Sequence, residues 1–240
     1  MTVLFISDLH LTPERPGIAR AFCEFMTHRA PSADALYILG DFFEYWVGDD
    51  AMEPFHHEMA AQLKAFTDTG KPLHLMPGNR DFAIGKQFLK ATRAQWLQDP
   101  TLIDLNGERV LLMHGDLLCT QDVQYLKYRK RIRHPLVLSI LRMTPLSYRK
   151  KLGQKIRENS KRAKTGKSLN IMDVTPEEVV RMMEQSDVKT LIHGHTHRPA
   201  IHQVSLQQGE GRRYVLGDWD RSGWCLEASE KGLDLQEFSI

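Results

Sequence analysis

Five short apolar stretches of β-type composition each end abruptly in a cluster of Asp, His or Asn residues. Of all the features of the 240-residue sequence, this recurrence restricts the possible folds most strongly. The stretches begin at Val3, Ala35, Leu73, Val110 and Thr190. The clusters are Asp8-Leu-His10, Gly40-Asp41, Gly78-Asn79, His114-Gly-Asp116 and His193-Gly-His195-Thr-His197. Open α/β sheets bind ligands at the carboxyl ends of their strands. We therefore expect the polar side chains to converge on one edge of a sheet.

Helical patterns lie between most of these strands, and the alternation predicts an α/β fold. The predicted helices span residues 18–29, 54–67 and 86–97, and a further helix opens near residue 175. At this last helix, Thr175 is the expected N-cap, Pro176 the first helical residue and Glu178 the reciprocal capping partner.

The pattern changes after His197 to four short strands, predicted at 201–206, 213–216, 224–227 and 233–238, with a hairpin turn at 208–211. These strands predict a second sheet packed on the first. With 42% hydrophobic residues the chain can bury one substantial core, so we expect a single domain over residues 1–240.

Basic residues are concentrated in one segment, although the formal net charge of the chain is only +2. Residues 123–168 contain fifteen of the 32 Lys and Arg residues but only one of the 30 acidic residues, Glu158. Apolar residues recur there at helical spacing, which predicts an inserted helical cap of two or three amphipathic helices divided near Pro135 and Pro145. Such a segment suits a polyanionic partner: phosphate groups, an anionic membrane or nucleic acid. The alternative is a solvated helix pair that only covers the core.

The sequence indicates at most a peripheral contact with membrane. The nearest candidate for a membrane span, around residues 136–148, is interrupted by Arg142 and Pro145. The three cysteines are widely spaced and odd in number, which is typical of proteins in a reducing cytoplasm.

The strand-end clusters indicate a centre of two metal ions. Their nitrogen and oxygen donors suit Mn²⁺, Fe²⁺ or Zn²⁺. A carboxylate between two cations offsets their repulsion, and Asp41 is the candidate for this bridge. The expected ligands are Asp8, His10 and His197 on one side, and Asn79, His114 and His195 on the other. Such a pair could activate a water molecule toward phosphorus, which predicts hydrolysis of a phosphate ester or anhydride. Taken alone, each cluster would more often be a set of polar residues that stabilises a backbone turn.

The ordered motifs resemble those of the calcineurin-like metallophosphoesterases. The matching residues are Asp8-x-His10, Gly40-Asp41-x-x-Glu44, Gly78-Asn79-Arg80-Asp81, His114-Gly115-Asp116 and Gly194-His195-x-His197. Within this superfamily, Tyr45-Trp46, Cys119-Thr-x-Asp122 and Arg198-Pro199 extend the likeness to the pyrophosphatase family that acts on UDP-2,3-diacylglucosamine in lipid A biosynthesis.

This resemblance implies hydrolysis of UDP-2,3-diacylglucosamine to UMP and 2,3-diacylglucosamine 1-phosphate, by water attacking the α phosphorus. It implies two Mn²⁺ ions as cofactor, other divalent metals being possible, and a peripheral location at the cytoplasmic face of an anionic inner membrane. The implied catalytic residues are Asp41, Asn79, Arg80, His114 and His195. The implied substrate contacts are Asn79, Arg80, Asp122, Ser160, Lys164, Lys167 and His195.

Arg80 stands where many members of the superfamily carry a histidine that assists the leaving group. Arginine donates protons poorly but can neutralise growing charge through its planar fork. A sugar 1-phosphate leaves as a stable anion, so the substitution favours a pyrophosphate over a phosphomonoester. The alternatives are a metal-dependent nuclease or cyclic-nucleotide phosphodiesterase on the same core, and a non-catalytic binding protein with structural metals. Nucleic acid is not expected as a partner.

Overall fold

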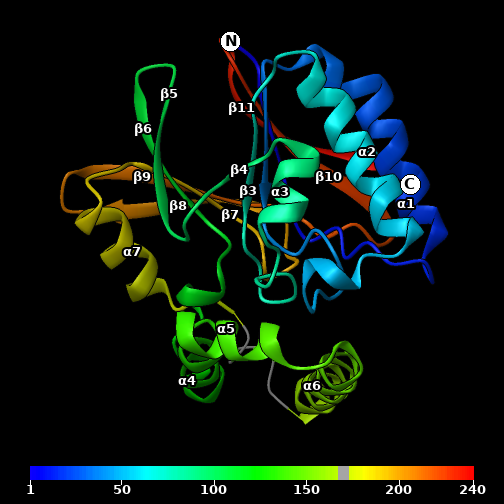
Figure 1. The fold of residues 1–240 in the computed structure, drawn as a ribbon. Helices are drawn as coiled ribbons and strands as arrows, with labels where there is room; N and C mark the ends of the chain where they lie inside the picture. The colour runs from blue at the N-terminus through cyan, green and yellow to red at the C-terminus, as the bar shows by residue number, and fades with distance from the viewer. Residues whose placement is uncertain (167–172) are drawn as a thin grey trace.

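The computed structural model describes residues 1–166 and 173–240, except for the side chains of 157 and 159–166, and contains two β-sheets packed face to face (Figure 1). The six-stranded sheet has the order β11-β10-β1-β2-β3-β4, in which β1 to β4 run parallel and β10 and β11 form an antiparallel hairpin at one edge. Its strands are β1 (Val3–Ile6), β2 (Ala35–Leu39), β3 (Leu73–Met76), β4 (Gln95–Trp96), β10 (Ser222–Ser229) and β11 (Gly232–Ser239).

The five-stranded sheet has the order β5-β6-β7-β9-β8. Its three central strands run parallel, and an antiparallel strand lies at each edge. Its strands are β5 (Thr101–Leu105), β6 (Glu108–Met113), β7 (Thr190–His193), β8 (Ala200–Leu206) and β9 (Gly209–Val215).

The core has three hydrophobic layers, one between the two sheets and one on the outer face of each sheet. Both faces of a sheet can be buried in this way because successive side chains of a strand point to opposite faces. On β1, Leu4 and Ile6 pack beneath the helices, whereas Val3 and Phe5 pack between the two sheets. The first layer lies under α1 (Pro16–Glu24), α2 (Pro54–Asp68) and α3 (Lys86–Thr92). A third layer joins the five-stranded sheet to α7 (Pro176–Gln185). The fold is therefore α/β with two packed sheets and flanking helices, as predicted.

Several predicted boundaries were wrong. The helix predicted over 86–97 ends at Thr92, because Arg93 adopts φ 56° and Gln95 then pairs with β3 as part of β4. The C-terminal strands do not form one sheet: β8 and β9 join the second sheet, and β10 and β11 join the first. The β8–β9 turn lies at residues 207 and 208, since β9 already begins at Gly209.

The observed starts of α2 and α7 agree with the predicted ones better than the boundaries above do, since Pro occupies the first position of each helix. Thr175 lies at the N-cap position of α7, but its hydroxyl makes no capping bond and accepts one from Thr120 instead. A reciprocal capping box is present at α2, where Glu53 and His56 each bind the backbone of the other. The sequence did not indicate this box, because histidine is not the usual residue at that position.

The cap consists of α4 (Val123–Ile132), α5 (Pro135–Met143) and α6 (Leu146–Gly166), which lie beyond the carboxyl ends of the parallel strands (Figure 1). The helices are divided at the two prolines that the sequence indicated. Arg149 attaches α6 to the core, since it donates to the Val47 carbonyl at 2.7 Å and forms an ion pair with Asp50. None of the helices in the described part of the chain combines the length and the apolar composition that a membrane span requires.

Candidate metal centre

All seven predicted metal ligands lie together at the carboxyl ends of the parallel strands, but they come from two sheets. The loops after β1, β2 and β3 supply Asp8, His10, Asp41 and Asn79, and the loops after β6 and β7 supply His114, His195 and His197. The expectation of a single sheet edge was therefore wrong. Face-to-face packing brings the two edges together, because the apolar layer between the sheets aligns their carboxyl ends.

Unusual backbone geometry marks this site. Among the residues that the structure describes, eight non-glycine residues have positive φ, and five of them are predicted ligands. These five are Asp8, His10, Asp41, His195 and His197. Asp and His adopt this conformation more readily than most residues, and such strained positions cluster at functional sites. Local backbone turns thus point these side chains inward.

Glycines allow the loops to approach one another closely. A Cβ atom on Gly78 would lie 2.1 Å from the backbone nitrogen of Asp41, and one on Gly194 would lie 2.2 Å from Oδ2 of Asp8. Neither contact is sterically possible, so both positions require glycine. This requirement explains why Gly precedes Asn79 and His195 in the sequence clusters.

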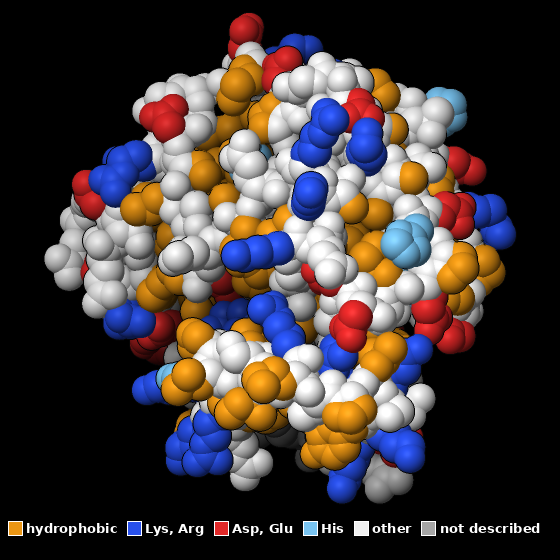
Figure 2. Space-filling model, viewed as in Figure 1, with side chains coloured by type: hydrophobic (Ala, Val, Ile, Leu, Met, Phe, Trp, Pro, Cys, Tyr) orange, Lys and Arg blue, Asp and Glu red, His pale blue; other side chains and the backbone are white. Residues whose placement is uncertain are grey.

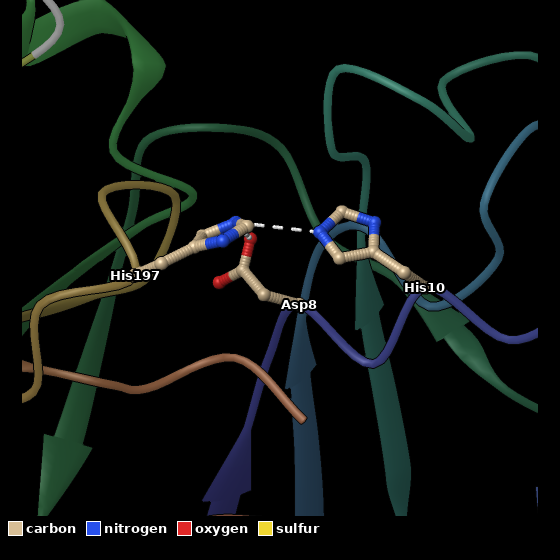
Figure 3. Close-up of side chains that lie close together, drawn as sticks. All are labelled: Asp8, His10 and His197. Carbon is tan, nitrogen blue, oxygen red and sulfur yellow. Dashed lines mark hydrogen bonds and ion pairs between the residues drawn. The ribbon is translucent and has the colours of Figure 1, made fainter. Parts of the chain in front are cut away.

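One half of the site is formed by Asp8, His10 and His197 (Figure 3). The Nε2 atoms of His10 and His197 face each other at 3.3 Å, and Nε2 of His197 lies 3.4 Å from Oδ1 of Asp8. The other carboxylate oxygen of Asp8 accepts hydrogen bonds from the Ser7 hydroxyl and from the backbone of His195. Asp8 is therefore oriented with one oxygen toward the two imidazoles.

The other half is formed by Asp41, Asn79, His114 and His195. Nε2 of His114 lies 3.1 Å from Oδ1 of Asn79 and 3.9 Å from Oδ1 of Asp41. The rings of His114 and His195 contact edge to face, with centroids 5.0 Å apart. Oδ2 of Asp41 lies 3.9 Å from Nδ1 of His10, so the Asp41 carboxylate stands between the two halves.

These residues fit a pair of divalent cations. Oδ1 of the fully buried Asp8 accepts no hydrogen bond from any described residue, as expected of an atom placed for a cation. Within the described chain, two groups bring their donor atoms within 4.8 Å of one another: Asp8, His10 and His197, and Asp8, Asp41 and His114. The donors are carboxylate oxygen and imidazole nitrogen, which suit borderline and hard metals. This is a candidate dimetal site.

The pKa values reflect the crowding of ionisable groups. Burial raises the pKa of the Asp41 carboxyl to about 7, and the negative charges of Asp81 and Asp8 act in the same direction. Burial lowers the pKa of His195 to about 3, assisted by the charge of His114. The site thus gathers carboxylates that bound cations would stabilise, and a neutral imidazole with a lone pair to donate.

Two further carboxylates support the ligands: Asp81, which the sequence showed only as part of a family motif, and Asp218, which no sequence prediction included. Buried Asp81 accepts hydrogen bonds from the backbone of Phe42 and Gly78, at 2.7 and 2.8 Å, and so joins the loops after β2 and β3. Asp218 lies 3.2 Å from Nδ1 of His197. Leu216-Gly217-Asp218 repeats the pattern of Leu39-Gly40-Asp41 after a strand, which could have identified it.

Arg80 lies beside the centre and is oriented by acidic residues. Its Nη1 donates to Oε1 of Glu44 at 2.9 Å, and its backbone N–H donates to Oδ1 of Asp41 at 2.8 Å. The guanidinium remains partly exposed and lines a cavity.

This cavity has a volume of about 350 Å³ and joins the metal centre to the cap. One end is polar, with His10, Asp41 and His197. The other end is apolar, and its lining includes Ile132, Leu138, Leu141, Leu152 and Ile156 of the cap. The inner faces of all three cap helices therefore contribute to one pocket.

Only some of the predicted substrate contacts have side chains that the structure describes. Asn79, Arg80, Asp122 and His195 line the cavity. Asp122 also caps α4, because its Oδ1 accepts from the backbone of Tyr125 at 3.1 Å. Ser160 and Lys164 belong to α6, but their side chains lie outside the described part of the chain, and Lys167 lies outside the described residues altogether.

Comparison with known proteins agrees with this geometry. Residues 1–199 match the family model described as calcineurin-like phosphoesterase. The chain is 54% identical, over 99% of its length and 96% of the relative, to the UDP-2,3-diacylglucosamine hydrolase of Pseudomonas fluorescens (strain SBW25). It is 53% identical, over 99% of both chains, to the protein of that name from Pseudomonas putida (strain KT2440). A structure described as a novel archaeal phosphodiesterase aligns over 100% of both chains with a TM-score of 0.48 and 13% identity. The family match and the two Pseudomonas relatives confirm the resemblance noted in the sequence.

Proposed function

The chain belongs to the calcineurin-like phosphoesterase family, and from this we propose that it hydrolyses the pyrophosphate bond of UDP-2,3-diacylglucosamine to UMP and 2,3-diacylglucosamine 1-phosphate. The observation that carries the proposal is the cavity that joins an Asp/His centre at one end to apolar cap side chains at the other. A diphosphate linked to two acyl chains needs both environments. The identity of 54% with a UDP-2,3-diacylglucosamine hydrolase over nearly the whole chain supports the same substrate.

We assign the seven converging side chains to two Mn²⁺ ions. Asp8, His10 and His197 would hold one ion; Asn79, His114 and His195 would hold the other; and Asp41 would bridge them. When bound, two such cations lower the pKa of a water molecule and neutralise phosphate oxygens. The position of the Asp41 carboxylate between His10 and His114 supports its assignment as the bridge.

In this proposal Arg80 binds the diphosphate, and Asn79, which is assigned to a metal ion, lines the same cavity. Glu44 holds the guanidinium of Arg80 at the cavity wall, where its planar fork can bind phosphate oxygens of the substrate. Water attacks the phosphorus nearer to uridine, and the departing sugar 1-phosphate, with a second pKa of about 6, needs little protonation. Charge neutralisation by arginine is therefore sufficient, and no general acid is required beside the leaving group.

The cap also offers a surface suited to an anionic membrane. Leu136, Ile140 and Met143 lie on one face of α5 and are 68%, 63% and 86% exposed. Exposed Lys151 and Lys155 follow on α6. Figure 2 shows hydrophobic side chains gathered over the cap with Lys and Arg around them. Apolar side chains framed by cations are typical of proteins that bind peripherally to anionic lipid. We propose that this face contacts the cytoplasmic side of the inner membrane, where the substrate would reside.

The purified protein should be assayed on UDP-2,3-diacylglucosamine, single-stranded nucleic acid and cyclic nucleotides, each with Mn²⁺ and with excess chelator. We expect Mn²⁺-dependent release of UMP from UDP-2,3-diacylglucosamine, no turnover of the nucleic acid or the cyclic nucleotides, and loss of turnover with chelator. In ¹⁸O-water the label should appear in UMP. Label in the sugar phosphate would contradict attack at the phosphorus nearer to uridine, and equal turnover of nucleic acid would contradict the substrate assignment.

A further inference from the structure

Helix α4 and its C-cap residue direct two arginines toward the core instead of toward solvent. The side chains of Arg129 and Arg133 are 14% and 15% exposed, whereas the neighbouring Lys130 and Arg131 belong to the exposed surface. The spacing of four residues places the two buried arginines on one face of the helix. This face points toward the loops of the metal centre.

Arg129 binds the loop that carries His114. Its Nη2 donates to Oδ2 of Asp99 at 2.6 Å and its Nε donates to Oδ2 of Asp116 at 2.7 Å. The other oxygen of Asp99 accepts from the backbone N–H of His114 at 3.1 Å. Arg129 is therefore separated from the backbone of a proposed ligand by one carboxylate.

Arg133 binds the loop that carries Asn79. Its Nη2 donates to the carbonyl of Gly78 at 2.8 Å, and the same nitrogen lies 3.4 Å from Oδ2 of Asp116. The guanidinium also lies over the ring of Phe82, 5.6 Å from its centroid. Because Gly78 is already in contact with the backbone of Asp41, a shift of its carbonyl would move both Asn79 and Asp41.

The two loops belong to different sheets, and the arginines connect them. Asp99 and Asp116 are almost completely buried, with side chains 1% and 0% exposed, so they need cationic partners. The cap supplies both partners. Across the same junction, Oδ1 of Asn79 lies 3.1 Å from Nε2 of His114. The cap arginines thus contact both the Asn79 loop and the His114 loop from outside the two sheets.

We propose that Arg129 and Arg133 are positioning residues of the metal centre, through which the cap holds the Asn79 and His114 loops at the separation that cation binding requires. The inference rests on the proposed dimetal function and deepens it. The cap is then part of the catalytic support as well as the wall of the substrate cavity. Residues that support metal ligands from outside typically change metal affinity 10- to 100-fold when they are replaced.

The test compares R129Q, R133Q and R133K with K130Q, which removes the same charge from the exposed side of the same helix. Near-ultraviolet circular dichroism and thermal unfolding establish that each variant is folded. Mn²⁺ affinity is then measured by calorimetry, and kcat and KM are measured on bis(4-nitrophenyl) phosphate and on UDP-2,3-diacylglucosamine. Deleting the whole cap would be less informative, because it also removes the cavity wall.

We expect R129Q and R133Q to weaken Mn²⁺ binding at least tenfold and to lower kcat in parallel on both substrates. R133K should show a smaller loss, and K130Q should stay within twofold of the wild type in Mn²⁺ affinity. The proposal would be overturned if R133Q kept the wild-type Mn²⁺ affinity and showed a raised KM only on UDP-2,3-diacylglucosamine. That result would assign the arginine to substrate binding. Failure of R133K to fold would also overturn it, because the residue would then serve the stability of the fold. A wild-type protein that binds no divalent cation would instead refute the proposed function.

Discussion

The carboxylate of Asp218 lies 3.2 Å from Nδ1 of His197, while Nε2 of the same ring faces Asp8 at 3.4 Å. Burial alone would lower the pKa of His197, but the neighbouring carboxylates of Asp218 and Asp8 raise the pKa to about 10. A carboxylate at Nδ1 keeps the proton on that nitrogen, so a cation that displaces the other proton finds Nε2 as the metal-binding atom. Asp218 therefore selects the tautomer that the proposed centre needs.

Replacement of Asp218 by alanine should weaken Mn²⁺ binding by roughly 10- to 100-fold, because the ring of His197 loses its orienting partner. Calorimetric titration of the chelator-treated protein with Mn²⁺ measures the effect. Asp220→Ala is the matched control, since Asp220 is exposed and pairs with Arg15 away from the centre. Equal Mn²⁺ affinities in the two variants would show that Asp218 does not support the metal centre.

Replacement of Arg80 by lysine should lower kcat by about 100-fold on UDP-2,3-diacylglucosamine, the scale of one lost charge-stabilising donor. Lysine keeps the charge but cannot bind Glu44 and phosphate oxygens together through a planar fork. Steady-state kinetics at saturating Mn²⁺ test this, with Arg20→Lys on the exposed face of α1 as the control. An unchanged kcat in Arg80→Lys would contradict the role in the transition state.

The stability of the protein should fall with acid partly through His56. Burial lowers the pKa of this imidazole, and its Nδ1 accepts the backbone N–H of Glu53 at 3.1 Å, a bond that protonation would break. A histidine in the unfolded chain titrates near about 6.5, so below that pH the unfolded state binds the extra proton. Above pH 6.5 His56 adds no pH dependence; as pH falls from there toward the lower folded-state pKa, stability is lost.

Glutamine at position 56 can still cap Glu53 but does not titrate. Between pH 7.5 and 5.5, the free energy of unfolding should fall less steeply in His56→Gln than in the wild type. The difference has an upper limit of about 1.4 kcal/mol per pH unit, the value for one proton. Urea unfolding at matched pH values measures both slopes, and parallel slopes would rule out a contribution from His56.

The outer face of α5 should govern binding to anionic vesicles. The double substitution Ile140→Ser with Met143→Ser should reduce partitioning at least tenfold, because burying each side chain in lipid contributes about 1.5–3 kcal/mol. Sedimentation with phosphatidylglycerol vesicles measures the change. Leu102→Ser with Ile201→Ser, which alters exposed apolar residues on the five-stranded sheet, is the control. Equal losses in both double variants would argue against a specific membrane face.

The sequence alone identified the β-strands that carry the site and the side chains that converge there. Both signals are local: an apolar run predicts a buried strand, and the polar cluster after it marks the strand end. The glycines beside Asn79 and His195 have a reason that is not local, since Gly78 and Gly194 are required where loops from different strands approach each other. The resemblance of these motifs to a known family then indicated the chemistry.

Only the tertiary structure decided which strands share a sheet, and so that the seven residues meet between two sheet edges instead of along one. It also revealed the pairing of His197 with Asp218 and of Arg129 with Asp99, contacts between residues far apart in the chain. The physical reason is that hydrophobic periodicity specifies which face of a strand is buried, whereas its partner depends on how all the buried faces pack together. The basic composition of residues 123–168 predicted a surface for anions, but packing turned two of those cations inward to neutralise buried carboxylates.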